Sequence, residues 1–512
     1  MTSGDGAGVV EADIVIVGSG MGGGTLAYAL RGLGIRVLIL ERGDFLPTER
    51  QNWEATAVFS GRYRADERWR DGDGRDYKPG VHYWVGGNTK MFGAALTRLR
   101  KEDFGELAHH GGMSPAWPIT YEEIEPYYTA AESLYRVHGR TGEDPTEPPH
   151  SAAFPYEPLA HEPVIARLDD RLRRQGLNPF HLPMGVDYRP GGGCVRCSTC
   201  DGFPCLVRAK SDAEVCAVRP ALASGNVDIS TRTKVIRLRT DPAGRRVVAV
   251  EAERDGERLD IRAGTVVLAA GAANTAAILL RSAPDGDPDG GLANASGQVG
   301  RNYMQHNMSA IMAIAPTRPR RIVFQKTIGV NDFYLAGDHW RYPMGSAATF
   351  GKLTGDILRS ARPHVPRAVL DQFARRSVDW WLMSEDLPDP DNRVRLDPRG
   401  RIVVHRRLNN YRAHVHLIRA TKRMLTRAGH PVVLHEKFGL ETNSHHCGTA
   451  RMGTDPAASV VDPAGRSHEI GNLFIADASV FPASAANNPA LTIAALALRL
   501  AHQVFGAPVP QG

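Results

Sequence analysis

A glycine-rich turn near the N-terminus, between a strand pattern and a helix pattern, constrains the fold of this chain most. Residues 13–17 read Asp-Ile-Val-Ile-Val, a β-branched run typical of a buried strand. The turn at 18–23 follows directly, and small residues then predict a helix over 25–33. A second strand is expected over 36–40, and Glu41 stands at its end. This order predicts a βαβ unit of the kind that binds a dinucleotide.

The three glycines of the G-x-G-x-x-G pattern have separate roles in such a unit. Gly18 permits the tight turn, Gly20 lets a pyrophosphate approach backbone N–H groups, and Gly23 allows helix and strand to pack. Glu41 can accept hydrogen bonds from a ribose diol, which disfavours a 2′-phosphate there. Arg42, its neighbour, is a further candidate for binding the cofactor.

The strands that complete the nucleotide fold come much later in the chain. Residues 234–238 and 246–250 have strand patterns, and 265–280 read as a strand, a glycine turn and a helix. Val235 and Ala270 in these segments are cofactor-binding candidates. A nucleotide domain interrupted by insertions is the layout of two-domain FAD oxidoreductases, whereas a nicotinamide dehydrogenase usually keeps its parallel strands contiguous.

Motifs in a fixed order along nearly the whole chain carry a family resemblance. They are the glycine loop at 85–95, W-P-I-T-Y-E-E-I-E-P-Y-Y at 117–128, G-R-N-Y-M-Q-H at 300–306, E-D-L-P-D-P-D-N-R-V at 385–394 and the C-terminal run at 445–492. With the N-terminal turn, this set resembles the glucose-methanol-choline family of FAD oxidoreductases. The resemblance implies an α/β fold of two domains: a Rossmann-like FAD domain interrupted by insertions, and a substrate domain with a mostly antiparallel sheet backed by helices.

The C-terminal run implies a catalytic pair. His445, two residues before Gly448-Thr449, and Asn488, before Pro489, resemble the His/Asn pair of pyranose oxidases and related glycoside oxidases. His445 is then expected to remove the hydroxyl proton, a task that suits imidazole near neutral pH, and Asn488 to hold the substrate oxygen. His446 is the alternative base. Pro489 and Thr492 open a helix aimed at the flavin, and Asp477 resembles the acid near its ribityl or phosphate groups.

The glycine loop bears on how FAD is attached. Gly87, Asn88 and Met91 are expected to contact the flavin, because the family covers the flavin with this loop. Fungal pyranose oxidases carry a histidine here that bonds covalently to the flavin methyl. Met91 occupies that position in this chain, so FAD is expected to bind non-covalently.

Four of the six cysteines form a dense cluster in the middle of the chain, Cys194, Cys197, Cys200 and Cys205. Their spacing approaches an iron–sulfur pattern but has four residues before the last cysteine. Three interpretations remain open: reduced or partly bridged cysteines packing a loop, which is favoured, an iron–sulfur cluster, and a structural zinc site. No metal ligand is therefore assigned.

The motif positions suggest a division into domains. The FAD domain is expected to comprise 1–160, 220–310 and 440–512, with a cysteine-rich insertion at 161–219 and a substrate domain at 311–439. Within the substrate domain, 345–366 is expected to form a loop over the pocket. Its aromatic residues could stack on sugar C–H faces but are more often core: Trp340, Tyr342, Phe350, Trp380 and Trp381.

Charge and targeting features narrow the partners. The net charge of +6 comes from 62 basic and 56 acidic residues that are interleaved, which favours a solvated mixed surface. Neither nucleic acid nor a membrane is expected as a partner. Met1–Gly6 lacks the pattern of a signal peptide, so a cytoplasmic location is expected. The oligomeric state stays open.

The implied function is FAD-dependent oxidation of a secondary hydroxyl, at C2 or C3 of a pyranose or glycoside, to the ketone, with O2 reduced to H2O2. The alternative is a dehydrogenase of the same family that uses a quinone, a cytochrome or an artificial electron acceptor. A lyase that uses flavin only as a scaffold is less favoured.

Overall fold

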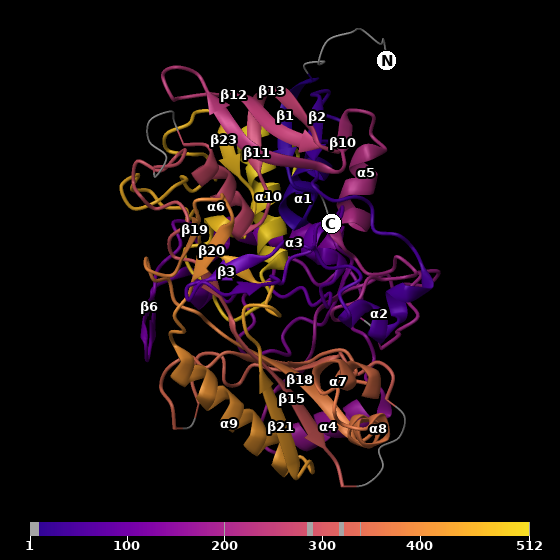
Figure 1. Ribbon diagram of the computed structural model, residues 1–512. Helices are drawn as coiled ribbons and strands as arrows, with labels where there is room; N and C mark the ends of the chain where they lie inside the picture. Colours follow the sequence, from indigo (N-terminus) through magenta and orange to yellow (C-terminus); the bar gives the residue numbers. More distant parts are fainter. Residues whose placement is uncertain (1–9, 199, 284–289, 317–321, 338, 511–512) are drawn as a thin grey trace.

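The computed structural model describes residues 10–198, 200–283, 290–316, 322–337 and 339–510. The hexapeptide Met1–Gly6, on which the absence of a signal peptide is predicted, lies outside the described residues. Figure 1 shows two sheets at opposite ends of the molecule, with α3 (Tyr121–Leu134), β3 (Trp69–Asp71), β20 (Ile402–His405) and connecting segments between them.

The predicted N-terminal strand is central in the first sheet. β1 (Val10–Val17) pairs in parallel with β2 (Val37–Leu40) on one side and β13 (Glu257–Leu268) on the other. Its β-branched side chains are buried on both faces, as a central parallel strand requires. The seven strands run β10-β2-β1-β13-β12-β11, and β23 also pairs with β13. The remaining strands are β10 (Val227–Ser230), β11 (Thr233–Thr240), β12 (Val247–Arg254) and β23 (Leu473–Ile475).

The first helix differs from the prediction at both ends. α1 (Met21–Leu30) starts four residues before the expected position, because the glycine turn leads directly into its first turn. Gly22, Gly23 and Gly24 are buried there against neighbouring backbone and side chains, so close packing outweighs their low helix propensity. The interrupted Rossmann-like sheet is otherwise as predicted.

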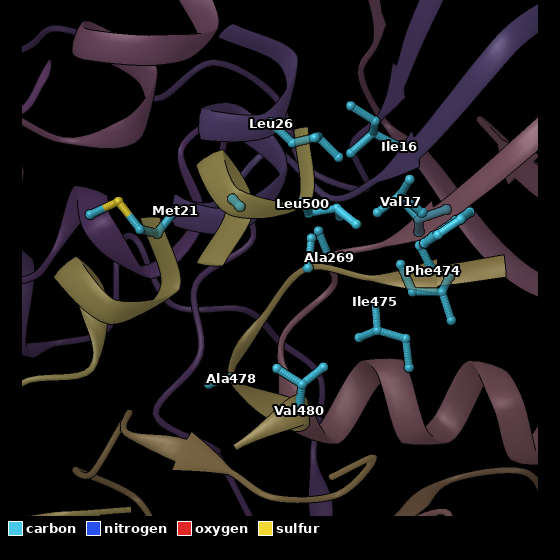
Figure 2. Close-up of a cluster of buried hydrophobic side chains, with 14 of the residues drawn as sticks. Ile16, Val17, Met21, Leu26, Ala269, Phe474, Ile475, Ala478, Val480 and Leu500 are labelled. Atoms are coloured by element: carbon cyan, nitrogen blue, oxygen red, sulfur yellow. The ribbon is translucent and has the colours of Figure 1, made fainter. Parts of the chain in front are cut away.

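The core of this sheet joins segments from both ends of the chain. Figure 2 shows Ile16 and Val17 of β1 and Leu26 of α1 packed near Phe474 of β23 and Leu500 of α10 (Ala490–Phe505). Because β23 and α10 complete this core, the C-terminal run is held beside the N-terminal turn.

The second sheet is antiparallel and backed by helices, as the predicted fold of the substrate domain requires. All neighbours in its order β21-β15-β18-β17-β16-β8 are antiparallel. Helices α4 (Pro163–Arg173) and α9 (Tyr411–Arg427) pack on it, burying Leu168 and Leu417 against Trp380. Figure 1 shows both helices beside this sheet. Its strands are β8 (Pro179–His181), β15 (Asn307–Ile314), β16 (Ile328–Val330), β17 (Ser346–Thr349), β18 (Ser377–Ser384) and β21 (Val432–Lys437).

Several elements cross the predicted domain limits. β8 comes from the expected cysteine-rich insertion, yet it pairs with β16 at the edge of the substrate sheet. β20 (Ile402–His405), expected in the substrate domain, pairs in parallel with β3 (Trp69–Asp71) of the N-terminal part. The segment 345–366 is not a loop, because it contains β17 and α7 (Gly355–Ala361). For β8, β17 and β20, backbone pairing with strands that are distant in the sequence causes the difference, and local patterns do not reveal such pairing.

The remaining helices and strands lie around and between the two sheets. The helices are α2 (Ala55–Phe59), α3 (Tyr121–Leu134), α5 (Arg219–Leu222), α6 (Ala272–Arg281) and α8 (Arg367–Ala374). The strands are β4 (Asp76–Tyr77), β5 (Leu107–His109), β6 (Gly112–Ser114), β7 (Val137–His138), β9 (Met184–Gly185), β14 (Met304–Gln305), β19 (Arg393–Leu396) and β22 (His446–Cys447). Among the described residues, no helix has the length and apolar character needed to cross a bilayer.

Candidate active site

A deep cavity lies where β1, β2, β13 and β23 end, which is where open α/β sheets bind ligands. Its wall includes residues from the first turns of three helices, α1, α6 and α10. Each helix N-terminus carries unpaired N–H groups and a partial positive charge. The cavity is therefore suited to a ligand with negatively charged groups along its length.

The glycine turn forms the middle of this wall. Gly18 has φ +101°, and a Cβ there would lie 2.4 Å from Ala269 O. A Cβ at Gly23 would lie 2.0 Å from Gly18 O, so helix and turn pack too closely for any side chain. At Gly20, by contrast, a Cβ would meet no protein atom within 4 Å and would project into open space. Gly20 thus leaves room for a ligand, whereas Gly18 and Gly23 are required by the fold.

Gly22 is a position whose role the sequence pattern did not reveal. A Cβ on this residue would lie 1.6 Å from Ala476 O, just after β23. α1 can approach the C-terminal strand only because Gly22 has no side chain. Gly22, which occupies one of the variable positions of the G-x-G-x-x-G pattern, is consequently required for packing in this protein.

Glu41 is buried at the cavity wall and holds the glycine turn in place. Its Oε2 accepts hydrogen bonds from the Ser19 hydroxyl at 2.6 Å and the Ser19 N–H at 3.1 Å, and its Oε1 accepts one from the Gly43 N–H at 2.9 Å. The carboxylate is thus fixed in a position from which it can also accept from a ribose hydroxyl.

The wall beyond Glu41 contains more positive charge than the sequence predicted. Arg42 and Val235 line it as expected, and so do Lys234 and Arg281, which were not predicted. Arg42 pairs with Glu67 at 3.0 Å and lies over the Tyr83 ring. Burial and the neighbouring Arg42 lower the pKa of Lys234. Only the tertiary structure brings these side chains together, and no local motif marks them.

Asp477 lines the cavity and links the C-terminal segment after β23 to the glycine turn before α6. Its Oδ2 accepts from the Gly271 N–H at 2.9 Å and the Thr275 hydroxyl at 2.6 Å, and its Oδ1 accepts from the Ser479 N–H at 2.8 Å. Burial raises the pKa of this carboxyl. Asp477 therefore anchors the start of α6, while Ala270 beside it lines the cavity as predicted.

The glycine loop covers one side of the cavity. Gly87 and Asn88 line it, and the Asn88 amide oxygen accepts from the His82 N–H at 2.8 Å, which holds the loop. Met91 was predicted to contact the cofactor, but its side chain packs into an apolar cluster with Tyr63 and Phe203 and does not line the cavity. The loop residues that follow it, 92–95, line the cavity instead.

Thr492, like Gly23 and Met91, is a predicted cofactor residue that does not line the described cavity wall. It lies on the side of α10 that packs against α3, and its hydroxyl bonds to the Tyr128 hydroxyl at 2.7 Å. Asn488 and Pro489, just before α10, do line the cavity. The helix direction is thus as predicted, with its N-terminus toward the cavity.

The two neighbouring histidines differ in their surroundings. His445 and Asn488 both line the cavity. His446 also reaches the wall, but its Nε2–H donates to the Asn443 carbonyl at 2.9 Å and its ring packs on Trp69 and Tyr303. Burial lowers the pKa of His446 to about 4. His446 is held in one position, so it is less suited than His445 to move a proton.

His445 has a neutral ring. Burial, with the nearby His306, His446 and Lys326, holds the pKa of His445 well below its usual range. Its Nδ1 lies 3.0 Å from Nδ1 of His306. Within the described residues, Nε2 has no protein partner. A neutral imidazole with one free nitrogen in a cavity wall can accept a proton from a ligand.

The aromatic candidates of the substrate domain lie elsewhere. Trp380 is fully buried between the substrate sheet and its helices, and Trp381 stacks on Phe438. Trp340 stacks on the His416 ring at 3.8 Å. The described cavity wall contains none of the five aromatic residues considered from the sequence.

The cysteine cluster also lies outside the cavity wall. Cys194, Cys197, Cys200 and Cys205 are half-buried and carry no disulfide, while Cys216 and Cys447 are buried. Cys194 and Cys200 pack beside Phe324, and burial raises the pKa of Cys200 to about 12. In the part of the chain that the structure describes, no three His, Cys, Asp or Glu residues are arranged to hold a metal ion.

Comparison with known proteins identifies the family. Profiles described as GMC oxidoreductase match residues 82–308 and 388–497. The chain belongs to the GMC oxidoreductase family. This GMC oxidoreductase is 31% identical to paromamine 6′-oxidase of Streptomyces fradiae, with 96% of this chain and 91% of that protein covered. It is 26% identical to 2-methyl-1,2-propanediol dehydrogenase of Mycolicibacterium austroafricanum, with 96% and 94% covered.

A solved structure shares the fold of this GMC oxidoreductase. Pyridoxine 4-oxidase from Mesorbium loti superposes with a TM-score of 0.66 at 20% identity, covering 97% of this chain and 99% of that one. Enzymes of this family bind FAD and act on CH–OH groups of sugars or alcohols. The relatives thus confirm the family and the type of enzyme. The narrower resemblance to pyranose and glycoside oxidases stays a prediction.

The cavity fits FAD. Gly20 leaves open space beside the start of α1, where a pyrophosphate can meet N–H groups. Glu41 lies on one side of that point, and His445 and Asn488 lie in the wall that α10 begins. The open space at Gly20, the N-terminus of α1 and the Glu41 carboxylate are therefore complementary to a pyrophosphate and a ribose.

Proposed function

We propose that this GMC oxidoreductase oxidises a hydroxyl of a pyranose sugar or glycoside to a carbonyl, with O2 as the final electron acceptor and H2O2 as the second product. His445 carries the proposal. Its ring is kept neutral, its Nε2 has no protein partner among the described residues, and it lines the cavity together with Asn488 and Pro489, which precede α10.

The residues of the chain divide the reaction between them. His445 Nε2 removes the hydroxyl proton, and the Asn488 amide donates a hydrogen bond to the same oxygen. When bound, FAD supplies the acceptor for the hydride that leaves the carbinol carbon. The N-terminus of α10 borders the cavity, so its positive end would favour negative charge added to a flavin bound there.

We further propose that FAD is held non-covalently. Gly18 and Gly20 admit the pyrophosphate, and Glu41 and Arg42 face the adenosine part. Gly87 and Asn88 cover the flavin from the glycine loop. Met91 supplies no imidazole for a covalent bond, and its side chain is buried away from the cavity.

The substrate hydroxyl is proposed to be a secondary one, at C2 or C3. This follows from the resemblance of His445 and Asn488 to the pair in pyranose and glycoside oxidases. Two relatives at 31% identity, paromamine 6′-oxidase and 6'''-hydroxyparomomycin C oxidase of Streptomyces lividus, are named for aminoglycosides and for a different position. A hydroxymethyl group of a sugar is therefore the competing reaction site. Under either alternative the substrate is a sugar or a glycoside.

The choice of O2 as acceptor has support and a competitor among the relatives. The two proteins at 31% identity are named oxidases. Relatives at 26% identity include 2-methyl-1,2-propanediol dehydrogenase and the fructose dehydrogenase large subunit of Gluconobacter japonicus. A dehydrogenase that passes electrons to a quinone or a cytochrome is the second candidate.

Anaerobic reduction of the bound flavin, followed by its absorbance, tests the proposal. The panel should hold free pyranoses, O- and C-glycosides and aminoglycosides, each with a deoxy analogue lacking the hydroxyl at C2, C3 or C6. Bleaching that is lost only with the C2 or C3 deoxy analogue supports a secondary hydroxyl. Loss with the C6 analogue would move the reaction to the hydroxymethyl group. Absence of bleaching with every sugar would contradict the proposal.

Two further measurements complete the test. After reduction, peroxide formed on admitting O2 is compared with dye reduction, and strong dye reduction without peroxide would favour the dehydrogenase. In His445→Ala, the rate of flavin reduction is expected to fall at least about 100-fold below the wild-type rate. The reason is that general base catalysis accelerates such a step by roughly 100- to 10,000-fold. A His445→Ala variant that matched the wild-type rate would assign the base elsewhere.

A further inference from the structure

His306, the last residue of the G-R-N-Y-M-Q-H motif, touches the proposed base directly. The residue follows β14 and is 2% exposed. Its ring meets the His445 ring edge to face, with ring centres 5.2 Å apart and an interplanar angle of 90°. The two Nδ1 atoms are 3.0 Å apart, which is hydrogen-bonding distance. One of these nitrogens must carry the proton, and the other must accept it.

The surroundings of His306 decide which nitrogen donates. His306 Nε2 lies 3.0 Å from the Ser484 carbonyl oxygen. A carbonyl only accepts, so His306 Nε2 carries a proton. Burial lowers the pKa of His306, so its ring is neutral and carries only that one proton. His306 Nδ1 is then an acceptor, and the hydrogen between the two rings belongs to His445 Nδ1.

We infer that His306 is a positioning residue that holds His445 in the Nδ1–H tautomer and leaves the Nε2 lone pair facing the cavity. One part of this inference rests on the proposed function: the role of Nε2 as the atom that takes the proton from the substrate. In the other tautomer, Nε2 would carry a hydrogen and could not remove one. The hydrogen bond between His306 and His445 thus sets the orientation of the His445 ring and also determines which of its nitrogens carries the proton.

The side chain of Asn443 bonds to the backbone of both histidines and holds their positions relative to each other. The Asn443 amide nitrogen donates to the His306 carbonyl at 2.6 Å, while its amide oxygen accepts from the His445 N–H at 3.0 Å. Gln305 Nε2 donates to the Asn443 carbonyl at 2.8 Å. Asn443 is 2% exposed, so water does not compete for these bonds. The distance between the two imidazoles therefore does not depend on their own hydrogen bond alone.

Charged groups around the pair act in opposite directions. Glu385 favours a positive charge on His306, whereas Arg406 disfavours it. Lys326 and His446 disfavour a charge on His445. Burial is the largest effect on both rings. The pair is consequently kept neutral, which is the state in which His306 can accept.

The tautomer can be measured without any substrate. Protein labelled with 15N-histidine gives distinct ring-nitrogen signals for Nδ1–H and Nε2–H imidazole, and the His445 signals are those lost in His445→Gln. The wild type is expected to show a protonated Nδ1 and an unprotonated Nε2. A protonated Nε2 on His445 in the wild type would overturn the inference, whether or not the protein oxidises sugars.

Two substitutions at His306 separate hydrogen bonding from packing. In His306→Asn, the side-chain oxygen can take the position of Nδ1 and accept from His445, so the tautomer and most of the rate of anaerobic flavin reduction are retained. In His306→Leu the acceptor is lost, and His445 is expected to shift toward Nε2–H. Flavin reduction is then expected to slow by roughly 10- to 100-fold, the usual effect of removing the partner that orients a functional histidine, with KM changed less than kcat.

A matched control tests whether any buried histidine has the same effect. His414 is 1% exposed in the substrate domain and bonds to Ser309 and Ser384, away from the cavity wall. His414→Leu is expected to lower stability but to leave the His445 signals and the reduction rate unchanged. An unchanged tautomer in His306→Leu, or an equal loss in His306→Asn, would refute the positioning role. If the tautomer is as inferred but no sugar bleaches the flavin, the proposed function fails and the inference stands.

Discussion

Two neighbouring glycines of the N-terminal turn should respond in opposite ways to the same added methyl group. Gly20 has φ −66°, which any residue can adopt, and a Cβ there enters open space in the cavity. Gly22 lies within α1, and a Cβ there would overlap Ala476 O at 1.6 Å. Gly20→Ala should therefore weaken FAD binding without changing the flavin-free protein, whereas Gly22→Ala should destabilise the flavin-free protein itself.

The size of each effect follows from the contacts. At Gly20, the methyl group displaces a charged phosphate from an N–H donor, a bond of about 1.5–3 kcal/mol, so Kd for FAD should rise roughly 10- to 150-fold. At Gly22, overpacking against backbone costs about 3 kcal/mol. Alanine returns about 1 kcal/mol through helix propensity, which leaves a net loss of roughly 2 kcal/mol.

Flavin titration of the apoprotein measures the first effect, and urea unfolding of the apoprotein measures the second. Gly20→Ala is expected to keep the wild-type urea midpoint, since nothing in the protein touches the new methyl group. Wild-type affinity for FAD in Gly20→Ala would refute the placement of the pyrophosphate beside α1. A wild-type midpoint in Gly22→Ala would refute the close packing of α1 on the C-terminal strand.

Three further predictions concern stability in acid, the hydrogen bonds of Asp477 and the attachment of the flavin. The pKa of His82 and His446 is lowered to about 4 and that of His414 to about 3, all chiefly by burial, so the unfolded chain binds protons below pH 6.5 that the folded chain does not. The free energy of unfolding should therefore fall as pH drops from about 6.5 to 4, by up to about 1.4 kcal/mol per pH unit for each such residue, and a flat urea midpoint over this range would contradict it. Asp477→Ala should destabilise the protein by roughly 1–3 kcal/mol in urea unfolding, because the donors at the start of α6 lose their acceptor, and no change would show that water replaces the carboxylate. Acid precipitation should release all flavin into the supernatant, since Met91 forms no bond to it, and flavin that stays with the pellet would contradict non-covalent binding.

The sequence was most informative where a role depends on one short segment. The turn at Gly18 needs a positive φ, and the spacing before Gly448 distinguishes His445 from its neighbour, so both could be predicted locally. Lys234 and Arg281 could not be predicted as cavity residues, because they come close to Arg42 and Glu67 only after distant strands pair.

Tertiary contacts also explain where the structure differs from, or adds to, what the sequence predicts. Met91 has the right position in the loop, but its side chain turns into an apolar cluster that includes residues from two other segments. The segment 345–366 has no strong strand pattern, yet β17 forms because β16 and β18 flank it with unpaired backbone groups. The role of His306 depends on a contact 139 residues away along the chain, which spacing cannot reveal.

The pairing of β23 with β13 has a consequence for how the protein is made. β13 ends at Leu268, but its second parallel neighbour is not synthesised until Leu473–Ile475. During translation this edge of the nucleotide sheet is open and exposes backbone groups that can pair with other chains. Loop closure over such a separation is slow, so the nascent protein depends on rapid arrival of its last segment or on protection by chaperones. Chains that stop before Leu473 should therefore aggregate rather than accumulate as a smaller folded protein.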